Sequence, residues 1–201
     1  MALIFEQINS EGLAQLSYIV GDDKAGVAAV IDPRRDVEVY INRARELGVS
    51  ITHAVETVPA AEKTEWLAKF LRRRTGEPVL VFMRTKSGAE RLARKLASMG
   101  LKAAALHADR TQQQRTQAVE GFRSGTYRVL VATDVAARGL DIDGITHVVN
   151  YEVPHSRETY VHRVGRTGRA EATGTALTLA APEELRALQA LQRSVGLEVQ
   201  G

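Results

Sequence analysis

The stretch RVLVATDVAARGLDI, residues 128–142, joins a short apolar run to a polar loop. The apolar run is Val129–Ala132, and an uninterrupted run of this length is typical of a strand buried on both faces of a parallel sheet. The loop that follows contains a hydroxyl, two carboxylates and a guanidinium, at Thr133, Asp134, Asp141 and Arg138. Open α/β sheets bind ligands at the carboxyl ends of their strands, so this loop is a candidate site. A polar loop with only a structural role is the alternative.

From Pro59 onward the sequence alternates between apolar runs and amphipathic helical patterns. The predicted strands are Pro78–Phe82, Ala103–Leu106, Val129–Ala132, Ile145–Asn150 and Thr175–Leu179. Helices are predicted around Trp66–Leu71, from a capping box at Ser87–Glu90 to Gly100, from Thr111 to Phe122, and from Pro182 to Val195. This alternation predicts an α/β fold, a three-layer sandwich with a mainly parallel sheet covered on both faces.

The first part of the chain has a different pattern, with strands followed by one helix. Strands are predicted at Leu3–Ile8, Leu16–Val20 and Val27–Ile31, with a turn at Gly21–Lys24. Apolar residues recur at helical spacing between Asp36 and Leu47, and Ile51–Val55 is the next predicted strand. We therefore expect these N-terminal strands and this helix to extend or flank the main sheet.

Length and composition exclude several classes of protein. The 201 residues are 44% hydrophobic and 25% charged, which is typical of a folded globular chain. The absence of cysteine excludes disulfides, a thiol nucleophile and cysteine-ligated metal sites. No apolar run approaches the roughly 20 residues that span a bilayer, and the N-terminus lacks the pattern of a secretory signal. We therefore expect a cytoplasmic protein without a membrane partner.

Charge is distributed unevenly along the chain. Residues 1–57 contain 5 Lys/Arg and 9 Asp/Glu, whereas residues 58–201 contain 22 and 15, and the formal net charge is +3. A basic segment of this kind is a candidate for binding a polyanion. The alternative is an ordinary solvated surface that is rich in arginine.

The densest group of functional residues is HRVGRTGR, residues 162–169. Arg163, Arg166 and Arg169 are spaced by three, so on a helix and its frayed end they would point the same way. Arginine binds phosphate well because its planar guanidinium donates to two oxygens at once, and glycines allow a ligand to approach the backbone. The cluster therefore predicts an anion site, with a solvated basic helix face as the alternative.

Five motifs, in order, carry a resemblance to a known family: VLVFMRTKSGAERLA, HADRTQQQRTQAVEGFRSG, RVLVATDVAARGLDI, HVVNYEVP and YVHRVGRTGRA. Together they resemble the C-terminal RecA-like lobe of a DEAD-box RNA helicase, over about residues 51–196. The resemblance implies a RecA-like sheet, single-stranded RNA as a partner and ATP as the nucleotide. Contacts to the phosphates of a single strand suit arginines and hydroxyls.

The resemblance also implies a role for each matching residue. Arg166 and Arg169 match the catalytic arginine fingers that reach the γ-phosphate of ATP. The residues that match nucleotide-binding or coupling positions are Gly139, Asp141, His162 and Arg163. The residues that match RNA-contacting positions are Arg84, Thr85, Gln112, Arg115, Thr133 and Arg138.

A complete DEAD-box helicase has a second lobe, and this sequence does not contain that lobe's motifs. It has no G-x-x-x-x-G-K-S/T loop to hold phosphates and no Asp-Glu-Ala-Asp to hold magnesium. We therefore expect no independent ATPase activity, no bound metal, and ATP binding that is weak or that requires a separate P-loop lobe. The alternatives are an ATP-dependent helicase subunit that is active with such a lobe and a chimeric fold without activity.

The first 57 residues resemble a different family. MALIFEQ, GLAQLSYIVGD and AAVIDPRRDVEVYINRARELGVSITHAVET are similar to the start of a metallo-β-lactamase-fold hydrolase of the persulfide dioxygenase and glyoxalase-like branch. In that family a similar strand leads into H-x-H-x-D-H, whereas here Thr57 is followed by VPAAE. No metal site is therefore carried over, and the missing ligands count against a metal hydrolase.

The two resemblances overlap in Ile51–Pro59, because a strand at this place suits both families. This overlap predicts a chimera, natural or designed, with its crossover in that strand; a natural N-terminal extension is the alternative. We expect two parts, a metallo-β-lactamase-like fragment at 1–57 packed on the rest, and a helicase C-terminal RecA-like domain at 51–201.

Overall fold

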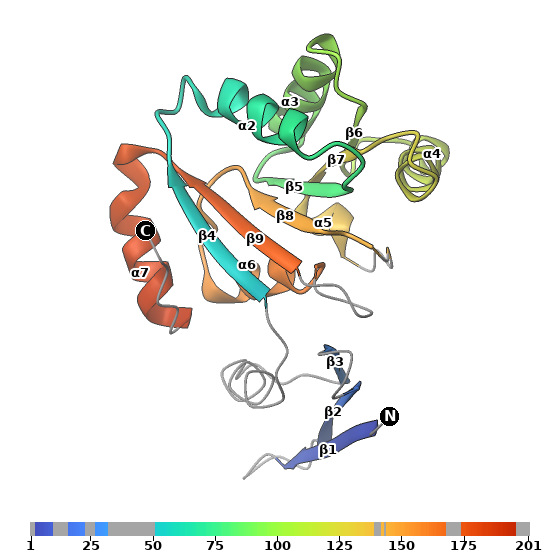
Figure 1. The fold of residues 1–201 in the computed structure, drawn as a ribbon, viewed down its shortest axis with the longest axis vertical. Coiled ribbons are helices and arrows are strands. Elements are labelled where there is room, and N and C mark those ends of the chain that lie inside the picture. The colour runs from blue at the N-terminus through green and yellow to red at the C-terminus, as the bar shows by residue number, and fades with distance from the viewer. Residues whose placement is uncertain are drawn as a thin grey trace.

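The computed structural model describes residues 3–9, 16–22, 27–31, 51–138, 142, 144–167 and 174–195. Most of these residues belong to one α/β body built on a six-stranded sheet (Figure 1). Its strands are β4 (Ile51–Thr57), β5 (Val79–Met83), β6 (Ala103–Leu106), β7 (Val129–Thr133), β8 (His147–Asn150) and β9 (Gly174–Ala180). They lie in the order β4-β9-β8-β5-β7-β6, and each neighbouring pair is parallel.

Helices cover both faces of this sheet. Successive residues of a strand point to opposite faces, and on β5 Val81 packs with one apolar cluster while Leu80 and Phe82 pack with another. The first cluster lies under α2 (Lys63–Arg73) and α3 (Lys86–Ser98). The opposite face is covered by α4 (Gln112–Arg123), α5 (Asp134–Ala137), α6 (Arg157–Val164) and α7 (Leu185–Val195). The expected three-layer α/β fold is confirmed.

The predicted strands of the body agree with the structure to within two residues at each end. The predicted helix at Pro182–Val195 divides into a 3₁₀ turn, η1 (Pro182–Glu184), and α7. The capping box predicted at Ser87–Glu90 is wrong, because α3 begins two residues earlier. Thr85 is its N-cap, with an extended backbone and a hydroxyl that accepts a hydrogen bond from the Gly88 N–H at 3.0 Å. The predicted start of α4 at Thr111 is confirmed: Thr111 is its N-cap and forms a capping box with Gln114.

The N-terminal strands are β1 (Leu3–Asn9), β2 (Leu16–Asp22) and β3 (Val27–Ile31), which form an antiparallel sheet in the order β1-β2-β3. The turn predicted at Gly21–Lys24 starts too early, because β2 continues to Asp22. Within the described residues these strands pair with one another and do not extend the six-stranded sheet. The helix predicted over Asp36–Leu47 lies outside the described residues, and the division into 1–57 and 51–201 stays a prediction.

A buried lysine ties the start of α2 to the C-terminal part of the body. The Lys63 ammonium, on a residue 4% exposed, donates to the carbonyls of Tyr151 and Leu179 at 3.1 and 2.9 Å and to the Glu184 carboxylate at 2.5 Å. Burial alone would raise the pKa of Glu184, but hydrogen bonds from Lys63 and the Ala181 N–H, with the Lys63 charge, hold it below its usual value. A buried charge is tolerated where it is paired in this way.

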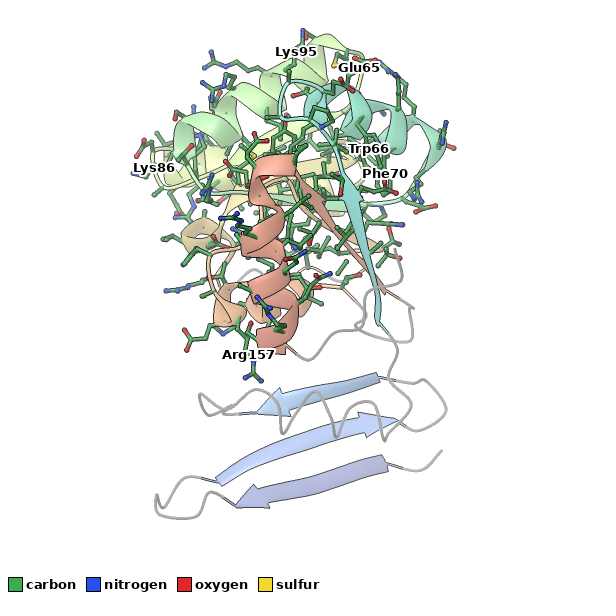
Figure 2. The ribbon with its side chains drawn as sticks, turned by 90° about the vertical axis from the view of Figure 1, so that its left-hand side faces the viewer. Glu65, Trp66, Phe70, Lys86, Lys95 and Arg157 are labelled. Atoms are coloured by element: carbon green, nitrogen blue, oxygen red, sulfur yellow. The ribbon has the colours of Figure 1, made fainter. Side chains whose placement is uncertain are left out.

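An aromatic pair lies on the outer layer, on α2. The rings of Trp66 and Phe70, one helical turn apart, stack with their centroids 5.5 Å apart (Figure 2). The Arg74 guanidinium lies 3.8 Å from the centre of the Phe70 ring, which continues the stack along the helix. Among the described residues, no helix is both long and apolar enough to cross a membrane.

Candidate functional site

The motif loops lie at one edge of the sheet. Because all six strands are parallel, the residues that follow β5, β6, β7 and β8 emerge at the same edge. Arg84 and Thr85 follow β5, Asp134 follows β7, and Glu152 comes shortly after β8. The α/β crossover pattern thus gathers side chains from segments that are far apart in the sequence.

A pocket of about 240 Å³ opens at this edge, between α5 and α6. Four of the residues singled out in the sequence line it, Arg138, His162, Arg163 and Arg166, and the other lining residues are Phe82, Asp134, Ala137 and Thr159. His162 and Arg138 are exposed and Arg166 is half-buried. The pocket therefore brings three arginines and a histidine together with a single carboxylate, a composition that suits an anion.

Arg163 differs from the other arginines of the pocket because its side chain is buried, with the residue 1% exposed. Its guanidinium donates to both oxygens of Asp134, at 2.6 and 2.8 Å, and to the side-chain oxygen of Asn150 at 3.1 Å. The bidentate pair leaves Arg163 with no strong tendency to recruit a second anion. The expectation that all three arginines are presented alike is therefore wrong for Arg163, which holds α6 against α5.

The hydrogen-bond chain continues into the sheet. Asn150, at the end of β8 and 0% exposed, donates from its amide nitrogen to the Thr178 hydroxyl on β9 at 3.1 Å. Sequence reasoning missed Asn150 and gave Asp134 no role. The available signal was a lone asparagine ending the apolar run HVVN, because a buried polar group needs a partner.

The end of α6 sets the position of Arg166. The helix ends at Gly165, and the Arg166 and Thr167 N–H groups close the turn onto the carbonyls of Arg163 and Val164. Thr167, 2% exposed, donates its hydroxyl to the carbonyl of Ile145 at 2.6 Å. These bonds fix the backbone at Arg166, which lines the pocket. Three other predicted site residues, Gly139, Asp141 and Arg169, lie outside the described residues.

The residues expected to contact a nucleic acid strand fall into two places. Arg84, Thr85 and Gln112 are exposed, and Arg115 is partly exposed, where β5 and β6 lead into α3 and α4. Thr133 is 6% exposed at the end of β7, so its hydroxyl is less accessible than the sequence suggested. Arg138, at the C-terminal end of α5, lines the pocket. The exposed residues form the outer part of the edge, and the pocket forms its inner part.

A second set of charges lies beside the outer part of the edge. The Glu90 carboxylate accepts hydrogen bonds from His107 at 3.0 Å and from Arg110 and Arg94. The bond from His107, opposed by partial burial and reinforced by Arg110 and Arg94, lowers the pKa of Glu90 to about 2. Within the described part of the chain, no three His, Asp or Glu residues gather closely enough to hold a metal ion.

Comparison with known proteins places this arrangement among helicases. The family described as "Helicase conserved C-terminal domain" matches residues 62–171. The chain is 45% identical over 137 residues to the ATP-dependent RNA helicase DeaD of Mycobacterium tuberculosis, and 44% identical over 153 residues to the DEAD-box ATP-dependent RNA helicase CshA of Bacillus subtilis. These matches cover 68% and 76% of this chain, but only 24% and 31% of the relatives' lengths.

Solved structures give the same result. The DEAD-box protein SrmB of E. coli, solved bound to the regulator of ribonuclease activity A, has a TM-score of 0.69 at 34% identity, covering 75% of this chain and 88% of that one. Dbp5 of S. cerevisiae, solved bound to RNA and ADP BeF3, has a TM-score of 0.69 at 32% identity, covering 76% of this chain and 41% of that one.

Proposed function

Because the chain belongs to the helicase conserved C-terminal domain family, in its DEAD-box branch, we propose that it binds single-stranded RNA and supplies the arginine half of an ATPase site. The single observation that carries this proposal is the pocket in which Arg138, His162 and Arg166 meet at the carboxyl edge of the sheet. Planar guanidiniums that converge on one cavity match the bidentate geometry of phosphate oxygens.

In this proposal Arg166, with Arg169, contacts the phosphates of ATP, and Asp141, Gly139 and His162 complete the nucleotide-binding side. Arg163 acts through the residues it holds, since Asp134 and Asn150 occupy its guanidinium. RNA lies along the outer part of the edge, on Arg84, Thr85, Gln112 and Arg115, with Thr133 and Arg138 between RNA and nucleotide. We place the chain in the cytoplasm as part of the same proposal.

We further propose that a separate P-loop lobe completes the ATP site. Arginines stabilise charge that develops on a transferred phosphoryl group, but a phosphate-binding loop and a magnesium carboxylate must come from elsewhere. This 201-residue chain contains neither motif, and it spans about a quarter to a third of the curated relatives it matches. ATP therefore binds weakly to the chain alone, or only when such a lobe docks, and the chain holds no metal of its own.

The RNA-binding part of the proposal is tested by titrating a labelled single-stranded RNA at two salt concentrations. Each phosphate contact contributes about −0.7 to the slope of log K against log salt on a single strand. Arg84→Gln and Arg115→Gln should each weaken binding and flatten that slope. Lys95→Gln is the matched control, since Lys95 is exposed in the last turn of α3, at the opposite end of the helix from Lys86 (Figure 2).

The nucleotide part is tested by measuring phosphate release with RNA present. The chain alone should give no RNA-stimulated release, whereas addition of a purified P-loop lobe should restore it, and Arg166→Ala should abolish that restored activity. RNA-stimulated release by the highly purified chain alone, lost in Arg166→Ala, would contradict the half-site.

We also propose that residues 1–57 derive from a metallo-β-lactamase-like fragment, with the crossover of the fusion in Ile51–Pro59. Two observations support this: β1–β3 form an antiparallel sheet of their own, and the helicase family match begins at residue 62. A variant that starts at Val49 tests the packing of this fragment on the rest. It should melt at a lower temperature than the full chain and should still bind RNA. Identical melting, with rapid amide exchange throughout residues 1–48, would contradict the packed arrangement.

A further inference from the structure

Arg84 and Glu152 face each other across two neighbouring strands. The parallel register pairs Phe82 of β5 with Asn150 of β8, and the ladder continues with a hydrogen bond of 3.2 Å from the Tyr151 N–H to the Phe82 carbonyl. Arg84 lies two residues beyond Phe82, and Glu152 lies two residues beyond Asn150. Their proximity is therefore fixed by the sheet and not by a chance meeting of two surface side chains.

Glu152 uses both of its carboxylate oxygens on Arg84. One oxygen accepts from the Arg84 backbone N–H at 2.8 Å, and the other accepts from the guanidinium at 3.3 Å. The Glu152 side chain is 22% exposed, whereas that of Arg84 is 54% exposed. The carboxylate is thus held in the sheet edge, and the guanidinium reaches out beyond it.

A backbone N–H together with an arginine is also the donor set that a nucleic acid phosphate takes at such an edge. The planar carboxylate and the tetrahedral phosphate both present anionic oxygens, so they compete for the same donors. A phosphate that binds Arg84 through both donors must first displace Glu152.

We propose that Glu152 occupies the phosphate position at Arg84, so that RNA binds there by exchanging a carboxylate for a phosphate. This inference rests on the proposed RNA-binding function and adds a residue that lowers its affinity. The carboxylate lowers affinity, because each bound strand must break the existing ion pair. It also keeps weaker anions from Arg84, since an anion with a single loose contact does not replace two hydrogen bonds.

Another pair at the same edge shows why Glu152 is singled out. Lys86 and Asp109 lie 2.6 Å apart, but their side chains are 51% and 64% exposed, and the partner of Asp109 among the described residues is the flexible Lys86 ammonium. Exposed pairs of that kind contribute little and separate readily. Glu152, by contrast, also accepts a hydrogen bond from the Arg84 backbone N–H, and a backbone group cannot rotate away as a side chain can.

The test is the affinity of Glu152→Gln for a single-stranded RNA. Glutamine keeps an oxygen that accepts from the Arg84 N–H, but it has no charge to offer the guanidinium. We expect binding to tighten about two- to five-fold, the range expected for loss of a partly exposed ion pair. We expect the salt slope to keep its value, because Arg84 makes the same phosphate contact in both proteins.

Two further variants separate this inference from a general effect of charge. Glu158→Gln removes an exposed carboxylate from the first turn of α6 and should change affinity less than Glu152→Gln. In an Arg84→Gln background, Glu152→Gln should have no effect on affinity. Thermal melting of each variant confirms that it is folded.

Each outcome of the RNA-binding measurements supports or overturns the exchange at Arg84. Tighter binding by Glu152→Gln that disappears in the Arg84→Gln background supports the exchange. Unchanged or weaker binding by Glu152→Gln, or a gain that persists without Arg84, overturns it while RNA binding by the chain stands. Absence of RNA binding by the unaltered chain overturns the proposed function and this inference together.

Discussion

Replacement of Arg163 by methionine should destabilise the body more than most single substitutions. The change removes three hydrogen bonds from a guanidinium that is 1% exposed and leaves Asp134 and Asn150 without their donors. Loss of one partner from a buried ion pair costs about 3–5 kcal/mol. The Asp134 side chain is 31% exposed and regains part of its hydration, so we expect a loss of about 2–4 kcal/mol in the free energy of unfolding.

That loss corresponds to a fall in melting temperature of about 4–16 °C, taking about 2–4 °C per kcal/mol for a chain of this size. Far-UV circular dichroism follows the whole chain. The fluorescence of Trp66, the only tryptophan, follows α2 and thus the six-stranded body alone. Agreement between the two signals would show that the body and the rest of the chain melt in one transition.

Two related variants give the control. Arg163→Lys keeps the charge but loses the bidentate geometry, so it should fall between the unaltered chain and Arg163→Met. Asp134→Asn leaves the buried guanidinium with a neutral acceptor and should also destabilise. If Arg163→Met melts within about 2 °C of the unaltered chain, the buried network does not stabilise the fold as argued.

Three other substitutions test the remaining features. Glu90→Gln should lower the free energy of unfolding by about 1 kcal/mol at neutral pH. His107 and the two arginines lower the pKa of Glu90 to about 2, so the stabilisation is present above the unfolded pKa near 4.5 and is lost as the pH falls toward 2. In urea titrations the difference between the variant and the unaltered chain should therefore vanish over that range, and a difference independent of pH would contradict the argument. Gly121→Ala would place a Cβ 2.5 Å from Cδ2 of the Tyr127 ring and should destabilise α4 by about 1 kcal/mol. In a Tyr127→Ala background the same change should stabilise α4 by about 1 kcal/mol, and thermal melts that show the same sign in both backgrounds would refute the clash. Lys63→Met removes one donor from two carbonyls and from Glu184, which keeps the Ala181 N–H. It should lower the free energy of unfolding by about 2–4 kcal/mol, with chemical denaturation as the measurement and the exposed Lys69→Met as control.

The elements of the body were predictable from sequence because each strand is an apolar run bounded by helical patterns. Every residue of Val129–Thr133 and Val79–Met83 is buried. Such strands can be predicted from their own apolar sequence, whichever strands lie beside them. The start of α3 was misplaced because Ser87–Glu90 fits the capping rule locally. The extended backbone of Thr85, which decides the true N-cap, is set by the exit of β5 from the sheet.

The site was predictable in composition but not in its pairings. The spacing of Arg163 and Arg166 placed both in one pocket, yet it gave no indication that Asp134, 29 residues earlier, binds one of them. Arg84 and Glu152 are 68 residues apart, and their contact depends on β5 lying next to β8. Strand order is a property of the whole sheet, so side chains that meet across strands are not visible in local spacing.

The position of β9 in the sheet has a consequence for how the chain is made. β9 lies between β4 and β8, and it pairs Gly174 with Ile51, although these two residues lie near opposite ends of the body's sequence. Closing a loop of that length must precede any stabilisation from the pairing, which makes folding slow in proteins of high contact order. During synthesis, the edges of β4 and β8 that β9 covers in the described structure therefore leave the ribosome before β9 does. We expect the nascent chain to lack a complete six-stranded sheet until translation has passed Ala180. Until then its strand edges are exposed to edge-to-edge association or to chaperone binding.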